Sequence, residues 1–249
     1  MLKEKQHQYG FSNNLPWILY NKYVPGLKQV GPKCGPVAVC MADHLQQSRI
    51  DKEKVEVIFQ AAQRNGYTNH GEMLSADNMA QLAGVICGCE AEVLVGGMRN
   101  HFHAIVGHIV AGKPVLMPYD NGFDQEPCQK NGNRAHWALA SGILLGLERG
   151  SVPKELYTQP IETLPWLCLP NDAISPFPVP FQQGLAKQGR SKSYRPWKLD
   201  EVAGSNEQLN QLDPDKDASE YVLPAGDLAV GLSGKVVLLH TRKGVESSI

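Results

Sequence analysis

Apolar side chains recur at helical spacing in four segments of the first half of the chain. After Cys34 they fall at every fourth position, and Pro36 suits the first turn of a helix, where a missing N–H costs nothing. Asp51 and Ser75 are residue types that cap helices, and apolar residues three and four positions apart follow each of them. We therefore expect helices over residues 34–45, after Asp51 to about Asn65, from Ser75 onward and over 99–111.

Short apolar runs bounded by turn residues predict strands, most of them in the second half of the chain. Seven prolines lie within residues 153–180, which excludes a regular helix or a central strand and predicts a surface excursion. Helices come first and strands after, which indicates the α+β class, with residues 1–14 as a poorly ordered lead-in and 15–249 as a single domain. The expected strands are 92–95, 114–119, 135–146, two strands joined by a turn within 181–197, 221–224 and 235–240.

The composition of the chain argues against several classes of function. A net charge of -1 gives no general attraction to nucleic acid or to an anionic membrane, and the longest apolar run, residues 137–147, is too short to span a bilayer. The first ten residues lack the apolar core of a signal peptide, so six cysteines indicate reduced thiols in a cytoplasmic protein. His101, His103 and His108 do not share one helix face, and no metal site is predicted.

Cys34 stands where a Gly- and Pro-rich turn enters the first helix. Unpaired N–H groups and the positive end of the helix dipole favour a thiolate there, and the thiolate is the nucleophilic form. Gln29, five residues earlier, is placed to return its amide toward Cys34, where it could join the Cys34 backbone N–H in stabilising an oxyanion. The alternative is a buried, inert cysteine after an ordinary turn.

A cysteine nucleophile needs a base, and His136 has the best setting of the eight histidines. It begins a long apolar strand at the edge of a loop, 102 residues after Cys34. The alternative for a single histidine in an apolar run is a satisfied core residue. Together with Cys34 and Gln29, the pattern favours the catalytic interpretation.

These residues also carry a family resemblance. Gln-x-Gly-Pro-x-Cys-Gly before a helix, followed later by His-Trp-Ala on a strand, resembles the C39-like branch of the papain-like cysteine peptidases. More narrowly, blocks spread in order over residues 15–240 resemble the actin maturation protease family. The blocks are 29–42, Gly71-Glu72-Met73 with 75–77, 118–120, 126–128, 135–146, 187–191, 205–209 and 221–226.

The resemblance implies both a fold and an activity. The fold would be papain-like, with the nucleophile helix packed on an antiparallel sheet. Members of the family remove the acetylated first residue, methionine or cysteine, from newly made actin and expose its acidic mature N-terminus. By motif match Cys34 would be the nucleophile, His136 the general base and then acid, and Gln29 the oxyanion donor, acting through a thioester.

The resemblance also bears on partners. Actin is the implied substrate, and no metal or organic cofactor is implied. Members often carry a proline-rich N-terminal tail that binds profilin; no such tail precedes Gln29 in this sequence, so profilin is not an expected partner. Neither nucleic acid nor membrane is expected.

The substrate's chemistry constrains the rest of the site. An acetylated terminus has no ammonium group, so the site should lack a carboxylate that anchors an amine. The acidic residues after the cut would suit cations, for which Arg134 and Arg190 are the candidates, with Lys187 and Lys192 as further options. Papain-like enzymes orient the histidine with an Asn or Asp on the next strand, and here Gln188 is the nearest amide, with Asp172 and Asn206 as further options.

Other functions remain open at this point. The chain could be a C39-like peptidase or amidase with another peptide substrate. It could instead be a non-catalytic module whose cleft only binds a peptide terminus. A glutamine-transferring enzyme would use the same Cys/His chemistry on internal glutamine side chains.

Overall fold

The computed structural model describes residues 17–45, 50–146, 161, 162, 164, 167–170 and 181–242. Within these residues nine strands form one sheet in the order β2-β9-β3-β5-β1-β6, with β4 beside β3, β7 beside β5 and β8 beside β7. All pairs are antiparallel except β1 with β6. The strands are β1 (Trp17–Asn21), β2 (Cys89–Leu94), β3 (Val115–Asn121), β4 (Pro127–Cys128), β5 (Ala135–Gly146), β6 (Leu167–Cys168), β7 (Phe181–Gln188), β8 (Arg195–Lys198) and β9 (Val236–Arg242).

The sheet is built around β5, which has 12 residues. Residues 135–140 pair with β3, residues 142–146 pair with β1, and β7 pairs along residues 138–146. Because a strand has two edges, β3 and β1 follow one another along one edge of β5 and β7 occupies the other. The first residues of β5 therefore lie where β3, β5 and β7 meet.

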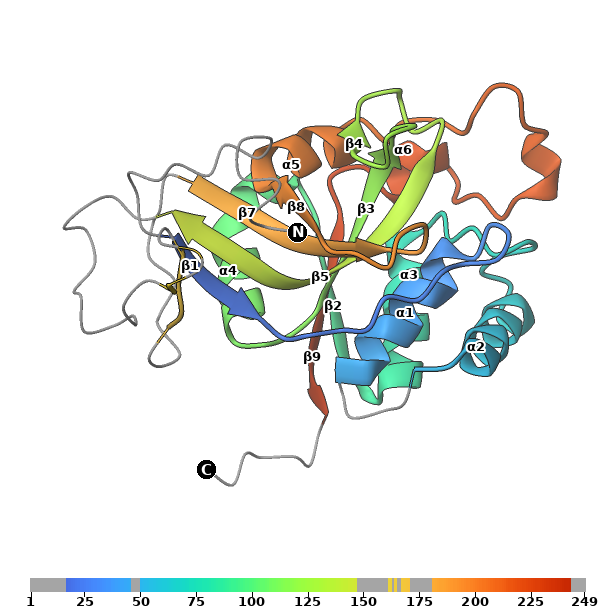
Figure 1. Cartoon of the computed structure of the whole chain (residues 1–249). Coiled ribbons are helices and arrows are strands. Elements are labelled where there is room, and N and C mark those ends of the chain that lie inside the picture. The colour runs from blue at the N-terminus through green and yellow to red at the C-terminus, as the bar shows by residue number, and fades with distance from the viewer. Residues whose placement is uncertain are drawn as a thin grey trace.

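Helices cover both faces of the sheet (Figure 1). On one face α1, α2 and α3 pack against the odd side chains of β5, such as Trp137 and Leu139. On the other face α4 and α5 pack against Ala138 and Ala140. Successive side chains of a strand point to opposite faces, so one strand supplies both cores. The helices are α1 (Cys34–Leu45), α2 (Lys52–Arg64), α3 (Ala76–Cys87), α4 (Phe102–Val110), α5 (Leu199–Glu207) and α6 (Asp227–Gly231).

The α+β class and the four N-terminal helices are confirmed. Asp51 caps α2 through the backbone N–H of Lys54, and the hydroxyl of Ser75 accepts a hydrogen bond from the N–H of Asn78 at the start of α3. In the fourth helical segment, a 3-10 turn over Met98–His101 precedes α4. The helix α1 packs on β5, as expected for a nucleophile helix on an antiparallel sheet.

Several strand assignments differ from the sequence-based expectation, and the short strands β4 and β6 are additional to it. The strand expected over residues 221–224 is wrong, because backbone groups there close turns: the N–H of Tyr221 bonds the carbonyl of Ala218, and the carbonyl of Pro224 accepts the N–H of Asp227. The segment Trp17–Asn21, for which no strand was expected, is strand β1, because the adjacent edge of β5 is open to it.

Several expectations fall on residues that the structure does not describe. The lead-in 1–14 lies outside the described residues, as do most of residues 153–180. Within that proline-rich segment the short strand β6 pairs with β1 at the end of the strand order, which agrees with the exclusion of a central strand. Among the described residues, no helix is long and apolar enough to cross a membrane.

Candidate active site

Cys34 is the first residue of α1 and is 5% exposed. The turn before it is sharp, since Gly31 has φ +67°, a conformation that favours glycine. The next residue, Gly35, lies against the side chain of Met73, and a Cβ there would come within 2.5 Å of the Met73 Cγ. The turn and this close contact fix the start of α1 and hence the position of the sulfur.

The thiol is linked to the start of β5. Burial raises the pKa of Cys34 to about 11, although hydrogen bonds with the backbone of Trp137 and Gly35 and the charge of Arg190 lower it. The carboxylate of Glu72 raises it further. Loss of hydration therefore opposes the thiolate that the start of the helix favours. Trp137 follows His136 directly, so the sulfur contacts the backbone next to the candidate base.

His136 is 4% exposed and lies at the start of β5. The Tyr119 ring on β3 meets its imidazole edge to face, with 5.7 Å between ring centroids. Burial lowers the pKa of His136 to about 3, and Arg190 and Arg134 lower it further. Its Nε2 is buried and has no hydrogen-bond partner among the described residues. The imidazole is therefore neutral at pH 7, and one of its nitrogens remains available.

Gln188, at the end of β7, holds the ring of His136. The two side chains form a hydrogen bond that raises the pKa of His136, as an oxygen acceptor for the charged ring does. Gln188 is completely buried; its Oε1 accepts the N–H of Arg190 at 2.6 Å and its Nε2 donates to Gln125 Oε1 at 3.0 Å. Of the other two options, Asn206 donates to the carbonyls of Pro118 and Lys235, and Asp172 lies outside the described residues.

The β7–β8 turn also holds Gln29. The backbone N–H of Gln29 donates to the carbonyl of Gly189 at 2.7 Å, and its Nε2 donates to the carbonyl of Gly31 at 2.8 Å. A Cβ on Gly189 would come within 2.5 Å of Gln29 Oε1, so the two segments are in close contact. One amide hydrogen of Gln29 is thus engaged with Gly31, which leaves the other for an oxyanion.

The expected cations divide into two groups. Arg134 and Arg190 both act electrostatically on His136, and a buried guanidinium nitrogen of Arg134 has no hydrogen-bond partner among the described residues. Arg134 also lies over the ring of Phe123, 4.3 Å from its centroid. Lys187, in contrast, is buried and donates to the carbonyl of Lys192 at 2.8 Å, so it is engaged within the fold.

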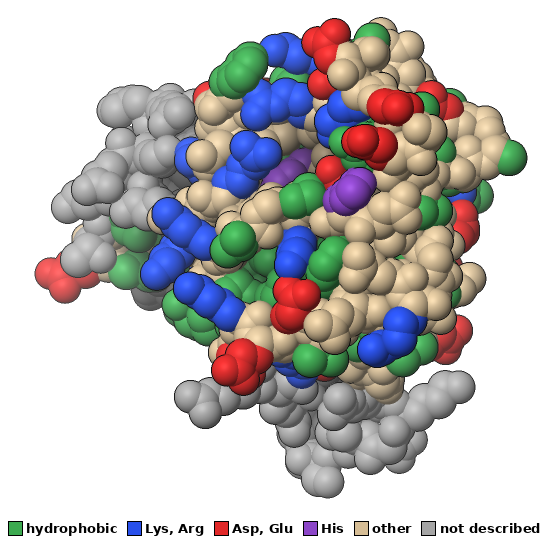
Figure 2. Space-filling model, turned by 90° about the vertical axis from the view of Figure 1, so that its right-hand side faces the viewer, with side chains coloured by type: hydrophobic (Ala, Val, Ile, Leu, Met, Phe, Trp, Pro, Cys, Tyr) green, Lys and Arg blue, Asp and Glu red, His purple; other side chains and the backbone are tan. Residues whose placement is uncertain are grey.

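The charged side chains are distributed unevenly on the side of the molecule that carries α1, α2 and α3. Lys and Arg side chains gather along one part of that side and Asp and Glu along another, around a hollow (Figure 2). One carboxylate lies near the candidate nucleophile, since the charge of Glu72 acts on Cys34. In the sequence, Glu72 is marked only by the family-like block Gly71-Glu72-Met73. It belongs neither to the motif around Cys34 nor to the motif around His136.

Comparison with known proteins gives a consistent result. Residues 24–144 match the family described as Actin maturation protease-like, C-terminal domain. The chain is 46% identical over 243 residues to the Actin maturation protease of Danio rerio, covering 95% of this chain and 78% of that protein. The corresponding protein of Xenopus tropicalis is 42% identical (97% and 79% covered), and that of Homo sapiens 39% identical (94% and 69% covered).

One solved structure is also similar. A putative C39-like peptidase from Bacillus anthracis superimposes with a TM-score of 0.45 at 11% identity, covering 88% of this chain and 95% of that chain.

Proposed function

The chain belongs to the actin maturation protease family, and we propose that it is a cysteine protease that acts on the N-terminus of immature actin. It removes the N-acetylated first residue, methionine or cysteine, and leaves the acidic mature terminus. Actin is its partner as substrate, and the cytoplasm is its compartment. The observation that carries the chemistry is the contact of Cys34 with the backbone beside His136, whose ring is held by Gln188.

The first half-reaction uses a neutral Cys/His pair. His136 takes the proton of the Cys34 thiol as the sulfur attacks the carbonyl carbon of the acetylated residue. The Gln29 side-chain amide and the Cys34 backbone N–H stabilise the oxyanion that forms. The imidazolium, stabilised by Gln188, then gives its proton to the departing amide nitrogen. The products are a thioester at Cys34 and actin with a free amino terminus.

The second half-reaction hydrolyses the thioester and regenerates the free enzyme. A water molecule attacks the thioester while His136 accepts its proton, and the proton passes to the sulfur as the C–S bond breaks. N-acetylmethionine or N-acetylcysteine leaves as the free acid. The overall reaction consumes one water and transfers no electrons. His136, Cys34 and this water account for every proton that moves.

Arg134 and Arg190 are the substrate-binding residues of this proposal. Both act electrostatically on His136, the residue that protonates the departing chain in this proposal. The residues that follow the cut in actin are acidic, and guanidinium groups bind carboxylates well. We place the acidic chain over these two arginines.

The deciding experiment is mass spectrometry of acetyl-Met and acetyl-Cys peptides that end in an acidic actin-like sequence. Wild type should release the acetylated first residue, whereas Cys34→Ala and His136→Ala should not. Cys128→Ala, a change of the same kind at a half-exposed thiol, is the matched control and should retain activity.

Two results would contradict the proposal. Failure of the folded wild type on both the peptides and whole acetylated actin would indicate a module that only binds the terminus. Mass changes confined to internal glutamine side chains would indicate a glutamine-transferring enzyme.

A further inference from the structure

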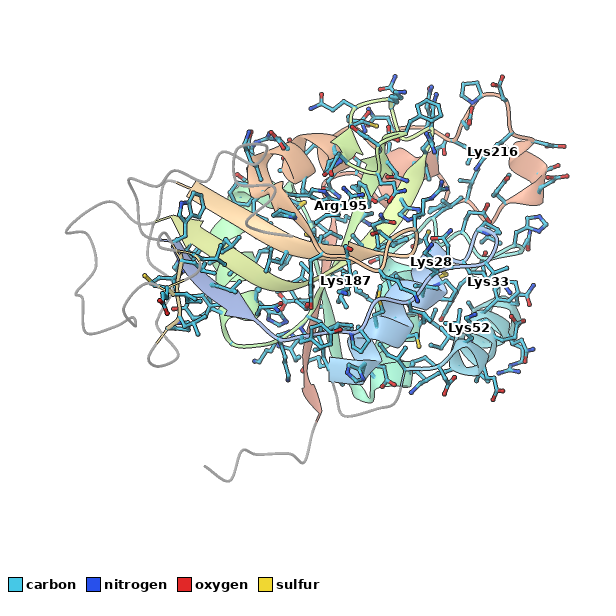
Figure 3. All side chains as sticks on the ribbon, viewed as in Figure 1. Lys28, Lys33, Lys52, Lys187, Arg195 and Lys216 are labelled. Atoms are coloured by element: carbon cyan, nitrogen blue, oxygen red, sulfur yellow. The ribbon has the colours of Figure 1, made fainter. Side chains whose placement is uncertain are left out.

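A groove of about 490 Å³ runs beside the segment that leads into Cys34. Its walls come from the turn before α1, from α2, from the loop between α2 and α3, and from the segment that follows α5. Lys33, which lines the groove, and Lys216 lie on the same side of the molecule (Figure 3). The lining residues used below are Lys33, Phe59, His70, Glu72, Glu220 and Tyr221.

Glu72 is held firmly in this groove. The residue before it, Gly71, has φ +123° and lies so close to Pro32 and Lys33 that a Cβ would approach within 2.9 Å of the Lys33 side chain. The residue after it, Met73, accepts the indole N–H of Trp137 at 2.7 Å. The loop that carries Glu72 is thus fixed both to the turn before Cys34 and to the residue after His136.

One oxygen of the Glu72 carboxylate accepts no hydrogen bond from the described residues. Its Oε2 is buried and has no hydrogen-bond partner among the described residues, although the charge of Glu72 reaches Cys34. The nearby cation, Lys33, pairs with Glu56 at 2.6 Å, on α2. An unpaired buried carboxylate oxygen is costly, so a substrate N–H that reaches it would gain a strong, charge-assisted bond.

The charges beside the two candidate catalytic residues differ in sign. Glu72 acts on Cys34, whereas Arg134 acts on His136, and Arg190 acts on both. If the acidic departing chain follows the arginines, the acyl residue extends away from them, on the side of Glu72, which lines the groove. Glu220 also lines the groove, and Lys216 lies over the ring of Tyr221, another lining residue, 5.0 Å from its centroid.

The groove also suits the side chain of the acyl residue. Phe59, His70 and Tyr221 line it, and the rings of His70 and Tyr221 meet edge to face at 6.0 Å. A thioether makes favourable contacts with aromatic rings. An acetylated methionine offers both a thioether and one amide N–H, which must find an acceptor once it leaves water.

We propose that this groove binds the acetylated first residue of the substrate and that Glu72 determines its specificity, by accepting the amide N–H of that residue and repelling acidic side chains. The inference rests on the proposed function. An acidic side chain on the first residue would be repelled by Glu72, so the groove favours methionine or cysteine at that position.

Binding to the inactive full chain tests the groove without requiring cleavage. N-acetylmethionine amide, titrated into Cys34→Ala and followed by NMR, should bind, and adding Glu72→Gln should weaken binding about tenfold. N-acetylaspartate amide should bind Cys34→Ala more weakly and gain affinity from Glu72→Gln. The matched control is Glu90→Gln, at an exposed glutamate on β2, which should change neither affinity.

Activity gives a second readout. Glu72→Gln should shift the ratio of kcat/KM for acetyl-Met over acetyl-Asp peptides by about tenfold toward the acidic residue. A purely structural role would lower both values and leave the ratio unchanged. The inference would be overturned if Glu72→Gln changed neither the probe affinity nor the kcat/KM ratio. Normal cleavage by wild type in the same experiment would leave the proposed function intact. Probe binding that depends on Glu72 in a wild type that cleaves nothing would support the groove and contradict the proposed function.

Discussion

Gln188 and His136 are joined by a side-chain hydrogen bond between the adjacent strands β7 and β5. Gln188 is opposite Ala138 in the strand register, two residues along from His136, so the contact is diagonal. The same amide is held by Gln125 and by the backbone of Arg190. We therefore propose that this fully buried, doubly anchored amide orients the imidazole.

Replacing Gln188 should lower catalysis more than stability. Gln188→Ala removes a bond to a ring that becomes charged during reaction, which is worth about 1.5–3 kcal/mol, or about 10- to 100-fold in kcat. Steady-state kinetics on an acetyl-Met peptide would measure it. Gln183→Ala, elsewhere on β7, is the control, and equal losses in both variants would contradict an orienting role.

Gly189 should tolerate no side chain, because Gln29 occupies the space. Gly189→Ala places a Cβ 2.5 Å from Gln29 Oε1, which must displace the proposed oxyanion donor. We expect kcat to fall about 100-fold, the effect of losing one such donor, with little change in KM. A Gln29→Ala variant should be equally slow, and combining the two changes should cost no more than either alone. Additive losses would show that Gly189 acts elsewhere.

Alkylation of Cys34 should report a neutral thiol. With a pKa of about 11, its rate with iodoacetamide should rise about tenfold per pH unit from pH 7 to 10, because only the thiolate reacts. Peptide mass spectrometry would follow Cys34 alone, with Cys128 as the internal comparison. A plateau below pH 8 would instead indicate a preformed thiolate–imidazolium pair.

The acid limb of the pH–rate profile should lie at an unusually low pH. The folded pKa of His136 is below its ordinary value, so the base stays neutral as pH falls through 6.5 and is lost only toward pH 3. Between pH 7 and 5, kcat/KM should therefore change by less than about twofold, whereas an unshifted histidine would be mostly protonated at pH 5. Measurement on a neutral-tailed peptide avoids titration of the substrate. An inflection near pH 6.5 would contradict the prediction.

Asp120 should be required for the loop before His136. It is fully buried, and its carboxylate accepts the N–H groups of Lys130, Gly132 and Arg134 at 2.8–3.1 Å. Asp120→Asn turns an amide N–H toward these donors and should reduce the free energy of unfolding by about 1–3 kcal/mol. Urea denaturation would measure the loss. Asp215→Asn, at an exposed position, should leave stability unchanged.

Charge reversal at Arg134 or Arg190 should weaken cleavage of acidic-tailed peptides. We expect kcat/KM to fall about tenfold or more at low salt and the loss to shrink as salt screens the charges. A neutral-tailed peptide should be affected far less, and this comparison removes any effect on His136 itself. Arg64→Glu, at the exposed end of α2, is the control. Equal losses on both peptides would place the arginines outside substrate binding.

Local sequence signals were sufficient for much of the fold. Pro36, Asp51 and Ser75 mark helix starts because capping and proline chemistry act within one turn, and the structure has helices there. The strand β1 was missed because a five-residue segment becomes a strand only when a partner edge is available. That edge belongs to β5, more than 120 residues later in the chain.

The sequence by itself determined the reactive residue types and the family, through Gln29, Cys34, His136 and the blocks around them. Tertiary structure decided their environment: burial makes the thiol and the imidazole neutral, and strand register brings Gln188 to His136. It also placed Glu72 beside Cys34, which spacing along the chain could not predict. Helix caps and motifs depend on near neighbours in sequence, whereas hydration and long-range charge depend on which distant segments exclude water from the same place.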